Sequence, residues 1–381
     1  MPNIKGYVWK AQFKQGATWY DLPNIQTVDI FRGRRLQIDD YGIDTASLNS
    51  RNPSGWTTAP KLGDQICIYI YAPGYVSGTD NFGCFFGRIR DVDIQYGIVP
   101  SEDEVSVSCE GVQGDWSRTQ LVDFNLPSQL TDESILDIGT EVGLDTASFF
   151  GRSTNSAITF TGNGLDLANQ ITRTEEARMF GFASTINSTP ILYWYGRNRA
   201  NFSTFYLTDG TAASSPAAIK YEQIEFRSSA DNYYNEVVVK PVGLASQTAT
   251  LNTTPIYGLP KDTRDATATQ GLNHAQWLLN NFQNKNQAIF SVTYTETMQS
   301  TTTGTGAPNA GPIDYAQAPI NNLFAIVFRG TTYYTICEGV QISSRPGQTR
   351  VTLFMSGQDQ NAYLILNDPI FGKLDFNKLG F

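Results

Sequence analysis

The chain has 381 residues, of which 40% are hydrophobic and only 17% are charged, and its formal net charge is −9. This length predicts two to four compact units. The acidic residues are spread along the chain, and the sequence has no basic patch of the kind that marks nucleic-acid binding. Thr, Ser, Asn, Gln and Gly replace the missing charges, which is typical of extracellular β proteins and of particle components.

The four cysteines do not form a disulfide framework in a chain of this length, and none lies in a C-x-x-C pair. Three of them fall in predicted strands, where a free cysteine behaves as a small buried hydrophobe. We therefore expect reduced thiols and synthesis in the cytoplasm. The N-terminus lacks the apolar segment of a signal peptide. No run approaches the roughly 18 apolar residues that span a bilayer, so we expect no stable membrane insertion.

Residues 1–118 are predicted to form a first β-barrel. Residues 45–49 alternate between polar and apolar side chains, which is the period-two pattern of a half-buried strand. Six or seven strands within this segment suffice for a barrel or a sandwich. The predicted strands are residues 6–13, 17–20, 28–35, 43–50, 65–72, 85–97 and 103–112, with a hairpin loop at 73–81.

The densest basic cluster consists of Arg32, Arg34 and Arg35, in the Arg-Gly-Arg-Arg sequence that ends the predicted strand 28–35. Two interpretations are open. The cluster is either an exposed strand end that contacts another subunit, or a phosphate site. We favour the subunit contact.

Residues 119–215 are predicted to form a small α/β domain. Thr131 is expected to cap a helix whose apolar residues are Ile135, Leu136 and Ile138. A second helix is expected from the near-helical spacing of apolar residues after Leu165. The segments PILYWYGR and FSTFYLTDG, which follow, predict a hairpin that continues the main sheet.

The rest of the chain is predicted to return to β-structure. Residues 216–258 are assigned to a second barrel, and 259–298 to a helix and a strand of an accessory domain, with the helix near 265–282. The low-complexity stretch 299–319 predicts a flexible polar loop. Residues 320–381 are assigned to a meander that completes the second barrel and to a tail.

The pentapeptide CEGVQ occurs twice, at 109–113 and at 337–341. It falls at a similar point of each predicted β module, which leaves two interpretations open: an internal duplication of barrels and a chance identity. The predicted fold class is mainly β with a small α/β insertion, built from two β-barrels and accessory α+β domains.

No pattern in the sequence predicts a catalytic, cofactor or metal site. His274 is the only histidine, and its place beside apolar helix residues favours a surface or packed imidazole over a catalytic triad or a zinc ligand. Nucleotide-binding and hydrolase motifs are absent. The pair Asp91 and Asp93 is explained by a solvated strand face as well as by the paired acids of a glycosidase. We therefore expect no enzyme, and a protein whose work is assembly or binding.

Several segments follow one another in a distinctive order. They are RGRR, YGIDTASLNSRNP, KLGDQICIYI, FGRIRDVDIQYG, VSVSCEGVQGDWSR, LDLANQITRTEEARMFGF, DNYYNEVVV and the terminal YLILNDPIFGKLDFNKLGF. Each motif is loose, but together they cover nearly the whole chain. Their order resembles the minor tail or baseplate hub proteins of tailed bacteriophages. Asp44 departs from the family pattern, which often has Gly or Thr at this point.

The resemblance implies the fold of the myophage baseplate hub, in which two tail-tube-like barrels lie side by side with α/β domains attached. It implies a homotrimer whose six barrels adapt the six-fold tail tube to three-fold tip components, around a channel that DNA crosses without specific binding. The implied partners are tail tube and distal tail proteins, the tape-measure protein, and tail fibre or tip proteins. The implied location is the virion tail tip, after assembly in the bacterial cytoplasm.

Two alternatives from other classes stay open. A receptor- or carbohydrate-binding tail component is supported by Trp19, Trp56, Trp116 and Trp194. It requires aromatic side chains beside exposed loops, whereas aromatic side chains buried between sheets favour the hub. A cell-wall hydrolase is the other alternative, and its activity would depend on His274 or on the paired carboxylates.

Overall fold

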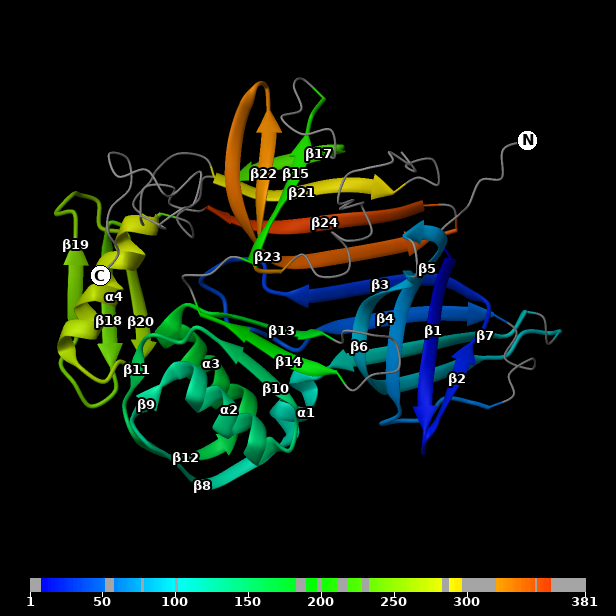
Figure 1. The fold of residues 1–381 in the computed structure, drawn as a ribbon, viewed down its shortest axis with the longest axis horizontal. Coiled ribbons are helices and arrows are strands. Elements are labelled where there is room, and N and C mark those ends of the chain that lie inside the picture. The colour runs from blue at the N-terminus through cyan, green and yellow to red at the C-terminus, as the bar shows by residue number, and fades with distance from the viewer. Residues whose placement is uncertain are drawn as a thin grey trace.

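The protein is mainly β-structure in the computed structural model, and most of its strands belong to one 14-stranded sheet (Figure 1). The predicted loop 299–319 and the terminal segment 358–381 lie outside the described residues. In the described part, no helix combines the length and the apolar character needed to cross a membrane. The described residues are 8–51, 58–76, 79–99, 102–182, 190–196, 201–210, 218–227, 233–282, 288–296, 320–346 and 348–357.

The first seven strands form one end of the large sheet, which is blue to cyan in Figure 1. Their pairing order is β3-β4-β7-β6-β5-β1-β2. The alternation predicted for residues 45–49 is confirmed, because Ala46 and Leu48 are buried and their neighbours are exposed. The strands are β1 (Val8–Gln15), β2 (Thr18–Leu22), β3 (Ile25–Gly33), β4 (Thr45–Arg51), β5 (Gln65–Val76), β6 (Thr79–Gln95) and β7 (Glu104–Gly111).

Seven later strands form the other end of this sheet, and they repeat the order of the first seven. Their pairing order is β17-β21-β24-β23-β22-β15-β16, so in chain order each strand has a counterpart in the first half. One direction differs, because β15 runs parallel to both of its neighbours whereas β1 is antiparallel to both. The strands are β15 (Asn201–Thr208), β16 (Ile219–Lys220), β17 (Gln223–Arg227), β21 (Ala288–Glu296), β22 (Asn322–Phe328), β23 (Thr331–Arg345) and β24 (Gln348–Gly357).

We expected two closed barrels, and the pairing shows two curled halves whose ends do not pair. The end strands of each half, β2 with β3 and β16 with β17, follow one another in the chain, but no ladder joins them among the described residues. The halves are joined by an antiparallel ladder between β3 and β23 that runs from Gly33↔Gly339 to Val28↔Ser344. One hydrophobic core contains residues of both halves.

Both halves carry a β-bulge at the same place. The β6–β7 ladder skips Arg90, and the β23–β24 ladder, which joins the counterparts of β6 and β7, skips Glu338. A bulge bends its strand and re-aims a side chain. The repeated pentapeptide does not mark this repeat, because Cys109 lies in β7 whereas Cys337 lies in β23, the counterpart of β6.

The segment between the two halves forms an α/β unit with its own core. Helix α3 buries Leu167, Ala168 and Ile171, the helical spacing that the sequence shows. Thr131 is the first residue of α2 and not its cap, and its hydroxyl donates to Glu175 (3.1 Å). The elements are α1 (Gln113–Arg118), β8 (Gln120–Leu126), β9 (Gln129–Leu130), α2 (Thr131–Val142), β10 (Thr146–Phe149), β11 (Thr154–Asn155), β12 (Ile158–Asn163), α3 (Gly164–Glu175), β13 (Arg178–Phe182) and β14 (Ile191–Tyr195).

The predicted hairpin after α3 is wrong. Strand β14 pairs with β13 and β10 in a separate three-stranded sheet, whereas β15 joins the large sheet. The side chains explain this split, because Leu192 and Trp194 on β14 are buried in the core of the α/β unit, while Leu207 on β15 is buried in the core of the two halves.

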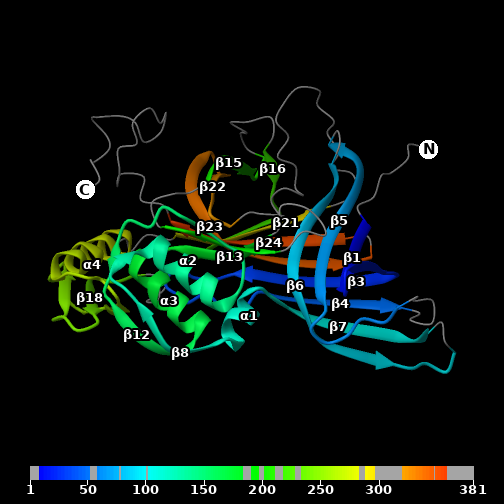
Figure 2. The same ribbon diagram turned by 60° about the horizontal axis from the view of Figure 1, so that its bottom comes forward.

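The accessory unit differs from the prediction in two ways. The strand assigned to it within 259–298 is β21 of the large sheet, and the unit contains strands from the segment that was assigned to the second barrel. It consists of β18 (Glu236–Pro241), β19 (Gln247–Thr250), β20 (Gly258–Thr263) and α4 (Ala268–Phe282). Its three strands form their own sheet and their own core with α4, so only β16 and β17 of the segment 216–258 return to the second half. Figure 2 shows the accessory and α/β units together at the end opposite β1 to β7. The cysteines are free and buried, as expected.

Candidate functional site: buried charges at the junction of the units

The junction forms where β3 ends against β23. Gly33 has a positive φ of 83°, and a Cβ there would lie 2.4 Å from the carbonyl oxygen of Glu338. A Cβ on Gly339 would lie 2.4 Å from the carbonyl oxygen of Arg34. Glycine at both positions therefore permits this close approach, and the Arg34 N–H donates to the Glu338 carbonyl (3.0 Å).

The bulge in β23 directs the Glu338 carboxylate into this junction, where it is fully buried. It accepts hydrogen bonds from Arg34 Nε (3.0 Å), Arg178 Nε (3.1 Å) and Ser356 Oγ (2.6 Å). Burial alone would raise the pKa of Glu338, but Arg178 and Arg34 outweigh it and lower the pKa to about 2. The carboxylate is therefore ionised and joins three segments of the chain.

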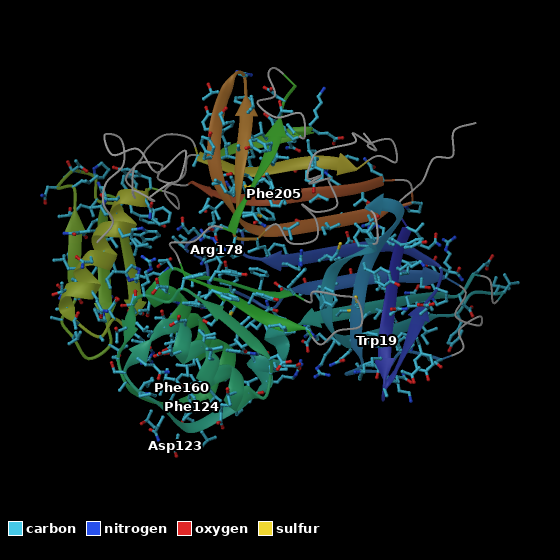
Figure 3. All side chains as sticks on the ribbon, in the orientation of Figure 1. Trp19, Asp123, Phe124, Phe160, Arg178 and Phe205 are labelled. Atoms are coloured by element: carbon cyan, nitrogen blue, oxygen red, sulfur yellow. The ribbon has the colours of Figure 1, made fainter. Side chains whose placement is uncertain are left out.

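These partners come from different units. Arg178 lies on β13 of the α/β unit, and Figure 3 shows it in the middle of the molecule, between that unit and the second half. The Arg34 guanidinium carbon lies 4.6 Å from the centroid of the Tyr41 ring. The backbone of Tyr41 exchanges two hydrogen bonds with the Asn169 side chain on α3 (3.1 and 3.0 Å). The end of the first half is thus fixed to both the second half and the α/β unit.

Asp44 also binds the end of β3. Its carboxylate accepts hydrogen bonds from the Gly33 N–H (2.9 Å) and the Gln113 amide (2.8 Å). Burial raises the pKa of Asp44 and lowers the pKa of the nearby Arg32. Asp44, the residue that departs from the family pattern, therefore binds the start of α1 to β3.

The structure corrects the prediction for the basic cluster. Arg32 is 1% exposed and Arg34 is 4% exposed, so neither is available to a second subunit. Both guanidinium groups point inward because buried carboxylates lie beside them. Arg35 is exposed, and its guanidinium carbon lies 5.6 Å from the Phe31 ring centroid and 5.7 Å from that of Phe354. Only Arg35 stays a candidate for a subunit contact.

A second group of buried charges fixes the accessory unit. His274 on α4 contacts Glu176 Oε1 through Nε2 (3.2 Å) and Asp265 Oδ2 through Nδ1 (3.3 Å). Lys261 Nζ lies 3.1 Å from the same Glu176 oxygen. Burial would raise the pKa of Glu176, but Lys261 and His274 outweigh it and lower the pKa to about 2. Burial would lower the pKa of His274, but the hydrogen bonds to the two carboxylates raise it.

The two groups hold the units together, and their burial keeps solvent and substrate away. His274 is 1% exposed, as the packed-imidazole interpretation predicts. Asp91 and Asp93 lie apart from both groups, on the exposed part of β6. Among the described residues, no three or more His, Cys, Asp or Glu side chains are placed to hold a metal ion.

The tryptophans also bear on the alternatives. Trp116 and Trp194 are fully buried in the core of the α/β unit. Trp19 is partly buried on β2, whose position at the edge of the first half is visible in Figure 3. Trp56 lies outside the described residues. Two of these four residues are therefore core residues and are not available to a glycan.

No family model and no curated protein sequence matches the chain. Solved structures match over nearly its full length. The 43 kDa tail protein of prophage MuSo2 from Shewanella oneidensis is 14% identical with a TM-score of 0.60, over 92% of this chain and 97% of that chain. A tail protein from Neisseria meningitidis MC58 is 12% identical with a TM-score of 0.60, over 93% and 97%.

A third match is the Escherichia coli c3393 protein, with 8% identity and a TM-score of 0.54, over 92% of this chain and 77% of that chain. It is described as a component of the type VI secretion system that is structurally similar to the T4 bacteriophage tail proteins gp27 and gp5. The chain therefore has the fold of phage tail proteins, and the fold that the sequence resemblance implies is confirmed at that level.

Proposed function

We propose that this protein is a structural component of a phage tail tip and serves as its hub. The observation that carries the proposal is the likeness of fold to two tail proteins. The match covers 97% of the chain of each of them. The buried charges support the same role, because they fix four units against one another and leave no carboxylate of the junction open to a substrate. We propose no catalytic role and no cofactor.

The repeated strand order supports a symmetry adapter. Three copies present six related halves. In the proposed ring, each half occupies the position of one tube-like barrel. A trimer of this kind can join a six-fold tail tube to three-fold tip components. The proposed partners are tail tube and distal tail proteins, the tape-measure protein, and tail fibre or tip proteins.

The charge of the chain supports a channel that DNA crosses without binding. With a net charge of −9, the chain offers little attraction to phosphates, and such attraction would slow the passage of DNA. A channel wall with a net positive charge would contradict this part of the proposal.

The decisive experiment is cryo-electron microscopy of tailed particles produced by cells that carry this sequence. We expect three copies of the chain in a ring at the tail tip, after assembly in the host cytoplasm. A particle that lacks the chain, or that carries it only as a peripheral glycan-binding fibre, would overturn the hub assignment.

A further inference from the structure

The two halves can be aligned residue by residue, because two independent features mark the same point in each. The first is the bulge, which skips Arg90 in β6 and Glu338 in β23. The second is a residue with positive φ whose N–H donates to the carbonyl oxygen of the residue that precedes the bulge. Gly63 (φ 82°) donates its N–H to Ile89, and Asn321 (φ 68°) donates its N–H to Cys337, both at 2.9 Å.

Beyond the bulge, β6 and β23 differ in what pairs with the edge that faces away from β7 and β24. Strand β23 pairs with β24 on one edge and with β3 on the other, from Gly339 to Ser344. Strand β6 pairs with β7 up to Gln95, and its only other partner, β5, ends its ladder at Arg88. In the described part of the chain, the second edge of β6 beyond Ile89 therefore carries no strand.

The counterpart of β3 is also open. Strand β3 pairs with β4 and β23, whereas β17 pairs only with β21 among the described strands. The single chain thus uses one edge contact between its halves, β3 with β23. Among the described residues, the two edges that correspond to this contact, on β17 and β6, pair with no strand. Open strand edges are templates for pairing with another chain.

We propose that β17 of one copy pairs with β6 of the next copy, in the antiparallel register that β3 and β23 use within one copy. The occupant of each open edge is therefore a second copy of this chain. Such a contact joins two different surfaces, so it generates a ring if the rotation closes. This inference rests on the proposed ring-forming function and specifies its contact.

In each half, a row of paired residues on four neighbouring strands relates the residues of the two outer strands to one another. In the first half the pairs run Asp29–Ser47–Ser108–Asp91. In the second half they run Glu225–Ser291–Phe354–Gly339. Asp91 and Gly339 are the first residues after the bulge, so Asp29 corresponds to Glu225.

The known ladder then gives the new one. Within the chain, the β3–β23 pairs are Asp29↔Ser343, Ile30↔Ile342 and Phe31↔Gln341. Moving each residue to its counterpart predicts three pairs between copies. They are Glu225↔Gln95, Phe226↔Ile94 and Arg227↔Asp93.

The side chains of these pairs are complementary, although side-chain chemistry played no part in deriving them. Arg227 faces Asp93, an opposite-charge pair, and Phe226 faces Ile94, which is 37% exposed in the single chain. Gln95 can donate to Glu225, as Ser343 Oγ donates to Asp29 Oδ1 (2.6 Å) in the internal ladder. Cross-strand pairs of these kinds stabilise a sheet.

The test is disulfide cross-linking of the full-length chain between the two predicted strands. The variant Arg227→Cys/Asp93→Cys places both thiols opposite one another, and the buried native cysteines leave little background. The matched control, Arg227→Cys/Gln95→Cys, moves one thiol two residues along the same face, beyond the roughly 7 Å that a disulfide spans. On oxidation at high protein concentration, we expect about tenfold more covalent multimer from the first variant than from the control.

Charge reversal gives a second measurement. Asp93→Arg and Arg227→Asp should each weaken self-association about two- to fivefold, and the double variant should restore it. Linkage of the in-register pair together with this rescue supports the proposal. Linkage of the control to the same extent, or no linkage of either variant, overturns it. In isolated tail tips, a ring without the in-register linkage overturns only the strand contact, whereas the absence of the chain overturns the tail-tip role.

Discussion

The bulges of β6 and β23 place the same backbone feature in two different settings. In β23 the skipped residue, Glu338, is fully buried between two arginines. In β6 the skipped residue, Arg90, is exposed. The strand order and the bulge are common to both halves. The residue at the bulge differs between them, because the neighbouring structure differs. The comparison teaches that the same backbone feature can anchor one half to its neighbours within the chain and lie beside an open strand edge in the other half.

The largest expected difference between the halves lies at the bulge itself. Glu338→Gln leaves Arg34 and Arg178 buried without a full negative partner, so we expect it to reduce the free energy of unfolding by about 3–5 kcal/mol. The matched variant, Arg90→Gln, changes an exposed residue and should stay within about 0.5 kcal/mol. Urea unfolding followed by tryptophan fluorescence measures both. Equal effects would show that the two bulges are not used differently.

Acid should act through the same carboxylate. The folded pKa of Glu338, about 2, lies below its ordinary value of 4.5 because Arg178 and Arg34 overcome the effect of burial. Its contribution to stability is therefore present above pH 4.5 and is lost as the pH falls towards 2. Melting temperatures of wild type and Glu338→Gln should converge over this window, while those of wild type and Arg90→Gln should run parallel. A constant gap down to pH 2 would contradict the assignment.

The contribution of His274 to stability depends on pH in the opposite direction. Its pKa is raised above the ordinary 6.5 because the hydrogen bonds to Asp265 and Glu176 outweigh its burial. Its charge therefore stabilises the docked accessory unit below pH 6.5, and this contribution is lost as the pH rises through the folded pKa. Hydrogen exchange of α4 amides should speed up over that rise in wild type. A His274→Gln variant, which has no titrating group there, should show no such pH step.

A smaller difference is expected one residue after each bulge. Gly339→Ala puts a Cβ 2.4 Å from the Arg34 carbonyl, so the β3–β23 ladder must shift, at a cost of about 1–3 kcal/mol. Asp91→Ala, at the corresponding position of β6, faces no second strand within the described chain and should be nearly neutral. Thermal unfolding of the two variants checks this, and a neutral Gly339→Ala would contradict the close approach.

The smallest effect on folding is expected at Arg35. Arg35→Glu changes an exposed side chain, so the free energy of unfolding should change by less than about 0.5 kcal/mol. If Arg35 contacts a neighbouring subunit, as the sequence favours, ring or tail assembly should fall while the monomer stays folded. Arg34→Glu should instead unfold the junction. Normal assembly of the Arg35 variant would remove this residue from the contact.

The strand pattern was readable from the sequence because it is local. Alternation at residues 45–49, the final meander and the helix near 265–282 depend on near neighbours along the chain, and they are confirmed. The junction was not readable, because Glu338 meets Arg34 and Arg178 from 304 and 160 residues away. A carboxylate beside the apolar residues Ile336, Cys337 and Val340 was the one available signal, since such a group needs a buried partner.

The strand pairing of the middle segment failed for the same reason. Strands β14 and β15 both look like members of one sheet, and β18 looks like a continuation of β17. Which core each strand joins depends on partners that are distant in sequence. The arginine cluster was misjudged because a basic strand end is usually exposed, whereas here Arg32 is buried near the Asp44 charge and Arg34 forms a buried ion pair with Glu338.

The pairing of Phe226 with Ile289 and of Arg227 with Ala288 has a practical consequence. Paired Cα atoms lie about 5 Å apart, so the chain leaves β17 and re-enters β21 through neighbouring points. The first half fills the same position with the short segment between β3 and β4. This position is therefore an insertion site, where another domain whose termini lie close together can replace the accessory unit. The exchange must also supply a new cation for Glu176, whose partners Lys261 and His274 would leave with the old unit.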